Sequence, residues 1–173
     1  GANHHVLPAP RISGGSRIDA RAVEKVQRHL KDATDKGATV IAGGKPHELG
    51  GFFFEPTILT GVDSSMAVAR EETFGPLAPL FRFSDEADVV RQANDTEFGL
   101  SAAVLSHHTQ KALRLARGIE SGSVHIGAHS FQSDALSPIG GYGMSGMGRS
   151  GGKYSIEAFT NLKWISIDLG APA

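Results

Sequence analysis

Two adjacent carboxylates followed by an aromatic ring form the stretch of this sequence best suited to binding chemistry. They occur in the run Glu71-Glu72-Thr73-Phe74-Gly75-Pro76. A carboxylate accepts hydrogen bonds from sugar hydroxyls, and an aromatic ring offers a flat apolar wall. Gly75 tolerates a positive φ, and Pro76 biases it away from the helical region, so we expect a turn that leads into the apolar run Leu77–Phe83. Such a turn suits the ribose and base of a nucleotide; the alternative is a plain surface turn before a strand.

A glycine-rich block between residues 140 and 152 is the second candidate, and it also contains Ser145, Arg149 and Ser150. Backbone amides in such a loop can cradle a phosphate. The block matches neither G-x-x-x-x-G-K-[ST] nor a G-x-G-x-x-G placed between a strand and a helix. The pattern therefore argues against a phosphate site.

The chain contains no cysteine, which excludes disulfides, thiolate metal ligands and a thiol nucleophile within it. The histidines at 107, 108, 125 and 129 lack a metal-ligand spacing, and His4-His5 is a poor metal site without further ligands. We therefore expect neither a metal site nor a catalytic residue. The three phenylalanines Phe52-Phe53-Phe54 are interpreted as core packing rather than as a ligand stack.

Charge and hydropathy indicate a globular domain without nucleic-acid or membrane partners. Seventeen basic and 18 acidic residues leave a net charge of −1, which favours neither nucleic acid nor an anionic membrane. No apolar run approaches the roughly 20 residues that a membrane span needs. Because we also see no secretory signal, a cytoplasmic location is expected.

Three segments resemble signatures of the NAD(P)-dependent aldehyde dehydrogenases. The Glu71–Pro76 run resembles their E-E-x-F-G-P, and Ala93–Ala102 resembles their A-N-x-x-x-Y/F-G-L-x-A. Ser137–Arg149 resembles their later P-F-G-G-x-K-x-S-G-x-G-R-E segment. The resemblance extends from about Ile18 to Ile167 and covers only the C-terminal third or so of such an enzyme.

The resemblance implies specific roles for three residues. Glu72 would accept hydrogen bonds from the ribose on the nicotinamide side of NAD or NADP, and Phe74 would wall the nicotinamide. Ile139 would line the aldehyde pocket where the family commonly has Phe, which would leave a wider pocket. In the family, a cysteine thiolate attacks the aldehyde, hydride passes to nicotinamide, and water activated by a glutamate hydrolyses the thioester. That cysteine, the general base and the dinucleotide domain have no counterpart here, so the chain alone is expected to bind no cofactor.

The sequence also departs from the family pattern at several positions. Gly127, Gly143 and Ser150 stand where the family often has Asn, Lys and Glu, respectively. These changes remove polar side chains near the active centre. The segments Gly148–Lys153 and Phe159–Ile165 resemble members that act on aromatic aldehydes such as vanillin or salicylaldehyde.

Alternating elements predict an α/β fold with a largely parallel sheet and flanking helices. The resemblance implies that residues 18–160 form part of an aldehyde dehydrogenase catalytic domain. Residues 1–17 are expected to form an irregular leader. Helices are expected after the caps Asp19 and Ser84 and from His108 or Thr109 to Gly122. Extended segments are expected at Ala38–Ala42, Pro56–Thr60, Leu80–Phe83, Ser101–Ser106 and Ser123–Ile126.

The last predicted element is a strand over Asn161–Ile167, followed by a polar tail, so residues 161–173 form an oligomerisation strand and tail. The resemblance implies that this strand joins a homo-oligomer.

The sequence thus predicts the C-terminal part of an aldehyde dehydrogenase, whose family reaction oxidises an aldehyde to a carboxylate with NAD or NADP. Two alternatives remain at this point. The chain is a non-catalytic oligomerisation or binding remnant, or it is a split subunit that needs a separate N-terminal chain.

Overall fold

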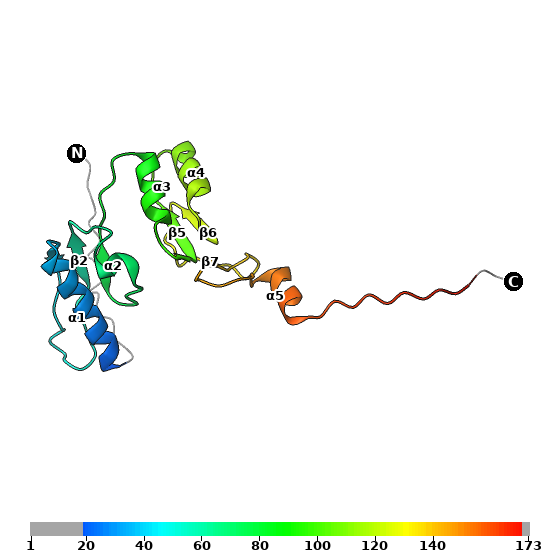
Figure 1. Ribbon diagram of the computed structural model, residues 1–173, viewed down its shortest axis with the longest axis horizontal. Helices are drawn as coiled ribbons and strands as arrows, with labels where there is room; N and C mark the ends of the chain where they lie inside the picture. Colours follow the sequence, from blue (N-terminus) through cyan, green and yellow to red (C-terminus); the bar gives the residue numbers. More distant parts are fainter. Residues whose placement is uncertain (1–18, 171–173) are drawn as a thin grey trace, which may run out of the picture. The chain divides into compact units, whose positions relative to one another are not determined.

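The computed structural model describes residues 19–170, and the chain divides after Phe83 into two compact units (Figure 1). Each unit is described by itself. The predicted leader, with His4 and His5, lies outside the described residues. None of the helices within residues 19–170 is long and apolar enough to cross a membrane.

The first unit packs a long helix against a mixed three-stranded sheet. Helix α1 (Ala20–Asp35) begins at Asp19, whose side chain accepts a hydrogen bond from the Ala22 amide, as predicted. The strands are β1 (Thr39–Ala42), β2 (Thr57–Thr60) and β3 (Leu77–Pro79), and a single helical turn, α2 (Ala67–Arg70), precedes β3. Strand β2 lies in the middle, antiparallel to β1 and parallel to β3.

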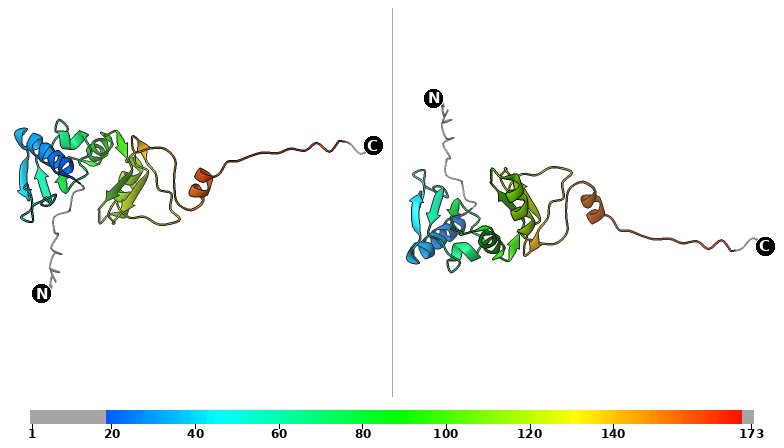
Figure 2. Two further views of the ribbon diagram at one scale, coloured as in Figure 1. Left: turned by 90° about the horizontal axis from the view of Figure 1, so that it is seen from below. Right: turned by 90° about the horizontal axis from the view of Figure 1, so that it is seen from above.

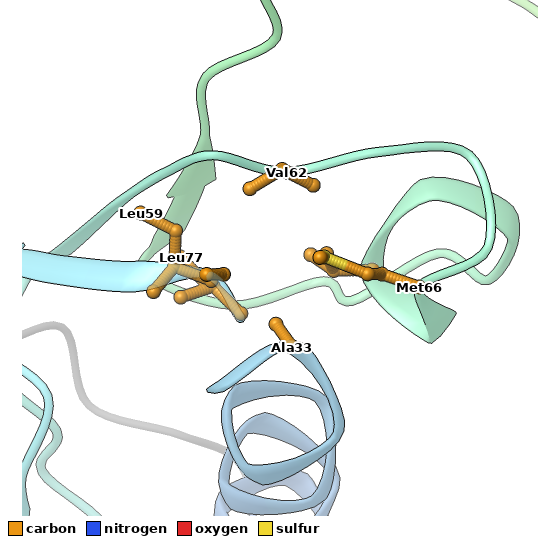
Figure 3. Close-up of a cluster of buried hydrophobic side chains, with 7 residues drawn as sticks. Ala33, Leu59, Val62, Met66 and Leu77 are labelled. Carbon is orange, nitrogen blue, oxygen red and sulfur yellow. The ribbon is translucent and has the colours of Figure 1, made fainter. Parts of the chain in front are cut away.

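The core of this unit lies between α1, α2 and the sheet. Figure 3 shows Ala33 of α1, Leu59 of β2, Leu77 of β3 and Met66 directed toward one another. Leu59 and Ala33 are fully buried. Because all three strands and both helices contribute to this one cluster, it fixes the position of α1 relative to the segment between α2 and β3.

The second unit contains a parallel strand pair with a crossover helix. Strands β5 (Ser101–Val104) and β6 (Ser123–Ile126) are parallel, and α4 (Thr109–Gly118) connects them and contacts both. Helix α3 (Glu86–Asn94) lies beside α4 (Figure 1). The Asn94 side chain donates to the Gly118 carbonyl and accepts from the Glu120 amide, which joins the ends of the two helices.

The remaining elements of the second unit lie within or next to the glycine-rich block, or pair with it. Strand β4 (Phe98–Gly99) pairs antiparallel with β7 (Tyr142–Gly143), and α5 (Gly152–Phe159) follows the block. The α5 helix was not expected from the sequence.

Several predicted boundaries are wrong; strand β5, for example, ends at Val104 rather than Ser106. The cap of α3 is Asp85, which accepts from the Asp88 amide, rather than Ser84. Helix α4 ends at Gly118, four residues before Gly122. Strand β3 ends at Pro79, so Leu80–Phe83 belongs to no strand.

The α/β character is confirmed, but a largely parallel sheet is not. Among the strand pairs of residues 19–170, β2–β3 and β5–β6 are parallel, whereas β1–β2 and β4–β7 are antiparallel. Asn161–Ile167 is exposed and belongs to no strand of this single chain, as the ribbon in Figure 2 shows. Its pairing with another subunit and the extent of one domain over residues 18–160 stay predictions.

The core of the first unit predicts a stability difference between two leucines. Replacing Leu59 by Ala should lower the free energy of unfolding of the purified chain by about 2–5 kcal/mol, because the side chain is fully buried and leaves a cavity. Leu49→Ala is the matched control, since Leu49 is 70% exposed and should change stability by no more than about 0.5 kcal/mol. Urea titration followed by circular dichroism measures both. Equal effects of the two substitutions would contradict the packing described here.

Candidate functional site

The turn Glu71–Pro76 connects α2 to β3 and is attached to the sheet at its C-terminal end. The Thr57 amide of β2 donates to the Pro76 carbonyl at 2.8 Å, and the parallel pairing of β2 with β3 begins one residue later at Leu77. At the other end, the Glu71 amide donates to the Ala67 carbonyl in α2. The turn is therefore a short segment held between two fixed elements.

Helix α1 holds Glu71 through an ion pair and a buried ring. The Arg28 guanidinium makes a two-pronged contact with the Glu71 carboxylate, with distances of 2.6 Å to Oε2 and 3.1 Å to Oε1. His29 Nε2 lies 3.3 Å from Glu71 Oε2. Hydrogen bonds from Arg28 and then from His29 stabilise the charged form and lower the pKa of Glu71 to about 2. Glu71 is thus held in place by side chains of α1.

The same histidine also holds Thr73. His29 Nδ1 lies 2.9 Å from Thr73 Oγ1, and the His29 side chain is fully buried. Glu71 and Thr73 both bond to His29 of α1, and Glu72 between them is exposed. The Glu71 backbone is extended, and in extended chain successive side chains leave on opposite sides. The arrangement therefore leaves the Glu72 carboxylate available to solvent.

Phe74 adopts a left-handed backbone conformation with a φ of 48°, and it is the one non-glycine residue with positive φ among residues 19–170. Gly75, which tolerates a positive φ, does not adopt one here. A bulky residue in this region costs about 1–3 kcal/mol, and such strain gathers at ligand-binding turns. The ring is 75% exposed. Phe74 is therefore exposed, two residues after Glu72, at a cost in backbone energy.

Ile139, the predicted pocket residue, is held in the second unit by a two-residue bridge. Its amide and carbonyl exchange hydrogen bonds with those of Ser150 at 2.7 and 2.8 Å. The side chain is 41% exposed. The structure thus brings Glu72 and Phe74 together in one turn, while Ile139 lies at the base of a separate loop.

The glycine-rich block packs closely against its own unit. A Cβ on Gly122 would overlap the Gly140 carbonyl, and a Cβ on Gly143 would overlap the Glu97 carbonyl. Gly143 also has a φ of 56°, so the lysine that the family often has there would be strained in this loop. Several backbone amides of the block donate hydrogen bonds to carbonyls within the same unit. The donors include the amides of Met144, Ser145, Gly146 and Ser150. The glycines allow backbone segments of the unit to pack closely against one another. The amides that donate to these carbonyls are not directed at a ligand.

Two residues that hold the turn were not identified from the sequence. Arg28 and His29 lie on α1, far along the chain from the turn. His29 follows the buried Val26 by three positions and precedes the buried Ala33 by four, so its place on the apolar stripe was the available signal. Among the residues that the structure describes, no group of three or more His, Cys, Asp or Glu side chains is placed to hold a metal ion.

The family model of the aldehyde dehydrogenases matches residues 8–165. This chain belongs to the aldehyde dehydrogenase family. It is 50% identical over 158 residues to the NADP-dependent succinate-semialdehyde dehydrogenase of Escherichia coli. This match covers 91% of this chain and 33% of that enzyme. It is 45% identical over 156 residues to the vanillin dehydrogenase of Pseudomonas fluorescens, covering 90% of this chain and 32% of that protein.

A solved structure gives the same result for the fold. The salicylaldehyde dehydrogenase of Pseudomonas putida G7, crystallised with salicylaldehyde, superimposes with a TM-score of 0.85 at 38% identity and covers 92% of this chain and 32% of that one. The chain therefore spans about a third of the length of the aldehyde dehydrogenases it matches. The family resemblance drawn from the three sequence segments is confirmed.

The contact between Arg28 and Glu71 predicts a coupling that disappears in acid. The folded-state pKa of Glu71, about 2, lies below its ordinary 4.5, so the stabilisation is complete above the ordinary value and is lost as the pH falls toward 2. A double-mutant cycle with Arg28→Gln and Glu71→Gln, measured by urea unfolding, should show favourable coupling near neutral pH that declines through this interval. A coupling that stays constant down to pH 2 would contradict the ion pair.

Proposed function

We propose that this chain contributes cofactor-binding and substrate-binding residues to an aldehyde dehydrogenase that oxidises an aldehyde to a carboxylate with NAD or NADP. The observation that carries the proposal is the turn in which the exposed Glu72 and the strained, exposed Phe74 lie two residues apart. Family membership supports it, since the E-E-x-F-G-P run is one of the segments that resemble the family. Either cofactor would accept the hydride that leaves the aldehyde carbon.

The residues of the turn fit the nicotinamide end of such a cofactor. Glu72 offers carboxylate oxygens to the two ribose hydroxyls, and the Phe74 ring, 75% exposed, offers an apolar face to the nicotinamide. Holding the ring against one face of the nicotinamide would orient the acceptor carbon, which is a positioning effect rather than a chemical step. Ile139 lines the aldehyde pocket, and its branched side chain leaves more room than an aromatic ring.

The thiol nucleophile must come from polypeptide outside these 173 residues, because the chain contains no cysteine, and the family resemblance implies the same for the general base. A charge-assisted hydrogen bond contributes about 1.5–3 kcal/mol, whereas micromolar binding of a dinucleotide needs about 8 kcal/mol. The chain alone therefore neither holds the cofactor nor turns over an aldehyde. It acts as part of a larger assembly, either as a segment of one long chain or as a split subunit completed by a second chain.

A chimera tests this function directly. The matching 158 residues of the E. coli enzyme are replaced by those of this chain, and succinate semialdehyde, vanillin and salicylaldehyde are assayed with NAD and NADP. We expect cofactor-dependent oxidation by the chimera and none by the isolated chain. Glu72→Gln in the chimera should lower kcat/KM by about 10- to 100-fold, because it removes a charged acceptor without changing volume.

The matched control for that substitution is Glu48→Gln, which removes an exposed carboxylate from a loop remote in sequence from the turn. A chimera that folds with bound cofactor but is inactive, or a Glu72→Gln variant with unchanged kinetics, would reject the proposed role.

A second candidate role, self-association, is favoured by the apolar residues of Asn161–Ile167. Leu162, Trp164 and Ile165 are 103%, 90% and 73% exposed. We propose that this segment pairs with a second copy of the chain, since exposed apolar side chains on an unpaired extended segment gain about 25 cal/mol per Å² when covered. A stable dimer covers about 1,200–2,000 Å² in total, which one strand pairing with its neighbouring side chains can supply.

Light scattering at micromolar concentration measures this association. The wild-type chain should be a dimer or larger, and Ile165→Lys should shift it toward monomer by placing a charge in the covered surface. Glu48→Gln, which changes an exposed carboxylate outside this segment, is the control. A monodisperse wild-type monomer, or an Ile165→Lys variant that associates as strongly, would overturn the proposal.

A further inference from the structure

A fully buried histidine holds the residues on both sides of Glu72. His29 Nδ1 lies 2.9 Å from Thr73 Oγ1, and Nε2 lies 3.3 Å from Glu71 Oε2. The ring sits on the apolar stripe of α1, where an aliphatic side chain would pack without needing hydrogen-bond partners. What distinguishes a histidine there is its ability to bond to two points of the turn at once.

Both tautomers of the ring keep the bond to Thr73 and leave neither ring nitrogen unbonded. The Thr73 hydroxyl both donates and accepts, so its bond to Nδ1 survives either assignment of the proton. When Nε2 carries the proton it donates to Glu71, and when it does not it accepts from Arg28 Nη2 at 3.2 Å. The ring is therefore bonded at both nitrogens in every neutral form, which keeps its orientation fixed.

The strained residue lies between this attachment and the sheet. Phe74 follows Thr73 directly, and Pro76 is bonded to the Thr57 amide at 2.8 Å. A left-handed conformation at a bulky residue persists only when its surroundings over-determine it. Here the segment between Thr73 and Pro76 is short enough that fixing its two ends restricts the backbone of Phe74 and Gly75.

We propose that His29 is the positioning residue of the turn: by holding Thr73 and Glu71 it keeps Phe74 left-handed and Glu72 directed away from α1. The ligand that this geometry serves, a nicotinamide ribose, rests on the proposed function. The conformational effect does not, and it is measurable in the isolated chain.

Nuclear magnetic resonance on the labelled chain tests the conformational effect. Three-bond couplings and the Cα and Cβ shifts of Phe74 report its φ, and the amide signals of β1 and β2 report whether the first unit remains folded. His29→Leu fills the site without hydrogen bonds and should release Phe74 to negative φ. His29→Asn places an amide near the position of Nδ1, so it should retain the Thr73 bond and much of the positive φ.

Two further variants keep the test decisive. Thr73→Val removes the hydroxyl and leaves the ring, so it should release Phe74 even if His29→Leu fails to fold. Glu24→Gln, on the exposed face of the same helix, should leave Phe74 unchanged. If Phe74 keeps its positive φ in folded His29→Leu or Thr73→Val, His29 does not position the turn.

The chimera separates this inference from the proposed function. His29→Leu should raise the KM of the chimera for the cofactor by about 10-fold or more. Expressed as free energies, this kinetic effect should exceed the loss of folding stability of the chimera. His29→Asn should bring the KM most of the way back to the value without the substitution. An inactive chimera together with a released Phe74 rejects the function and keeps the positioning role. An active chimera whose cofactor KM is unaffected by His29→Leu rejects the positioning role for the cofactor.

Discussion

The pair of hydrogen bonds from the His29 ring to Glu71 and Thr73 is the interaction on which the candidate site depends. The ring comes from α1, and α1 is in turn fixed by the core that Ala33 shares with Leu59 and Leu77. Burial of that cluster and the geometry of the turn are therefore linked. A loosened core would move α1, and the movement would reach Glu72 and Phe74 without any contact between those residues and the core.

Much of the first unit could be predicted because its signals are local. Asp19 caps the N-terminus of α1 by accepting a hydrogen bond from the amide three residues later. The stripe of Val26, Leu30 and Ala33 identifies the buried face of that helix. Errors arose where two neighbouring residues carry the same propensity. Ser84 and Asp85 both cap helices well, and the structure uses the second. Glycines before Gly152 suggested a continued loop, which obscured the start of α5.

The conformation of Phe74 shows where local reasoning fails. Glycine has the lower intrinsic cost at positive φ, yet Phe74 takes it and Gly75 does not. The difference comes from attachments to residues far along the chain, His29 at one end and Thr57 at the other, which outweigh the backbone preference. The specific roles expected of Glu72, Phe74 and Ile139 came from the family resemblance, since spacing alone was compatible with both a nucleotide-binding turn and a plain surface turn.

The most direct measurement is a crystal structure of the chimera with NADP bound. Glu72 is predicted within hydrogen-bond distance of the ribose hydroxyls on the nicotinamide side, with the Phe74 ring against the nicotinamide and His29 bonded to Thr73. A bound cofactor whose nicotinamide ribose is held by other residues, with Glu72 directed to solvent, would contradict the account.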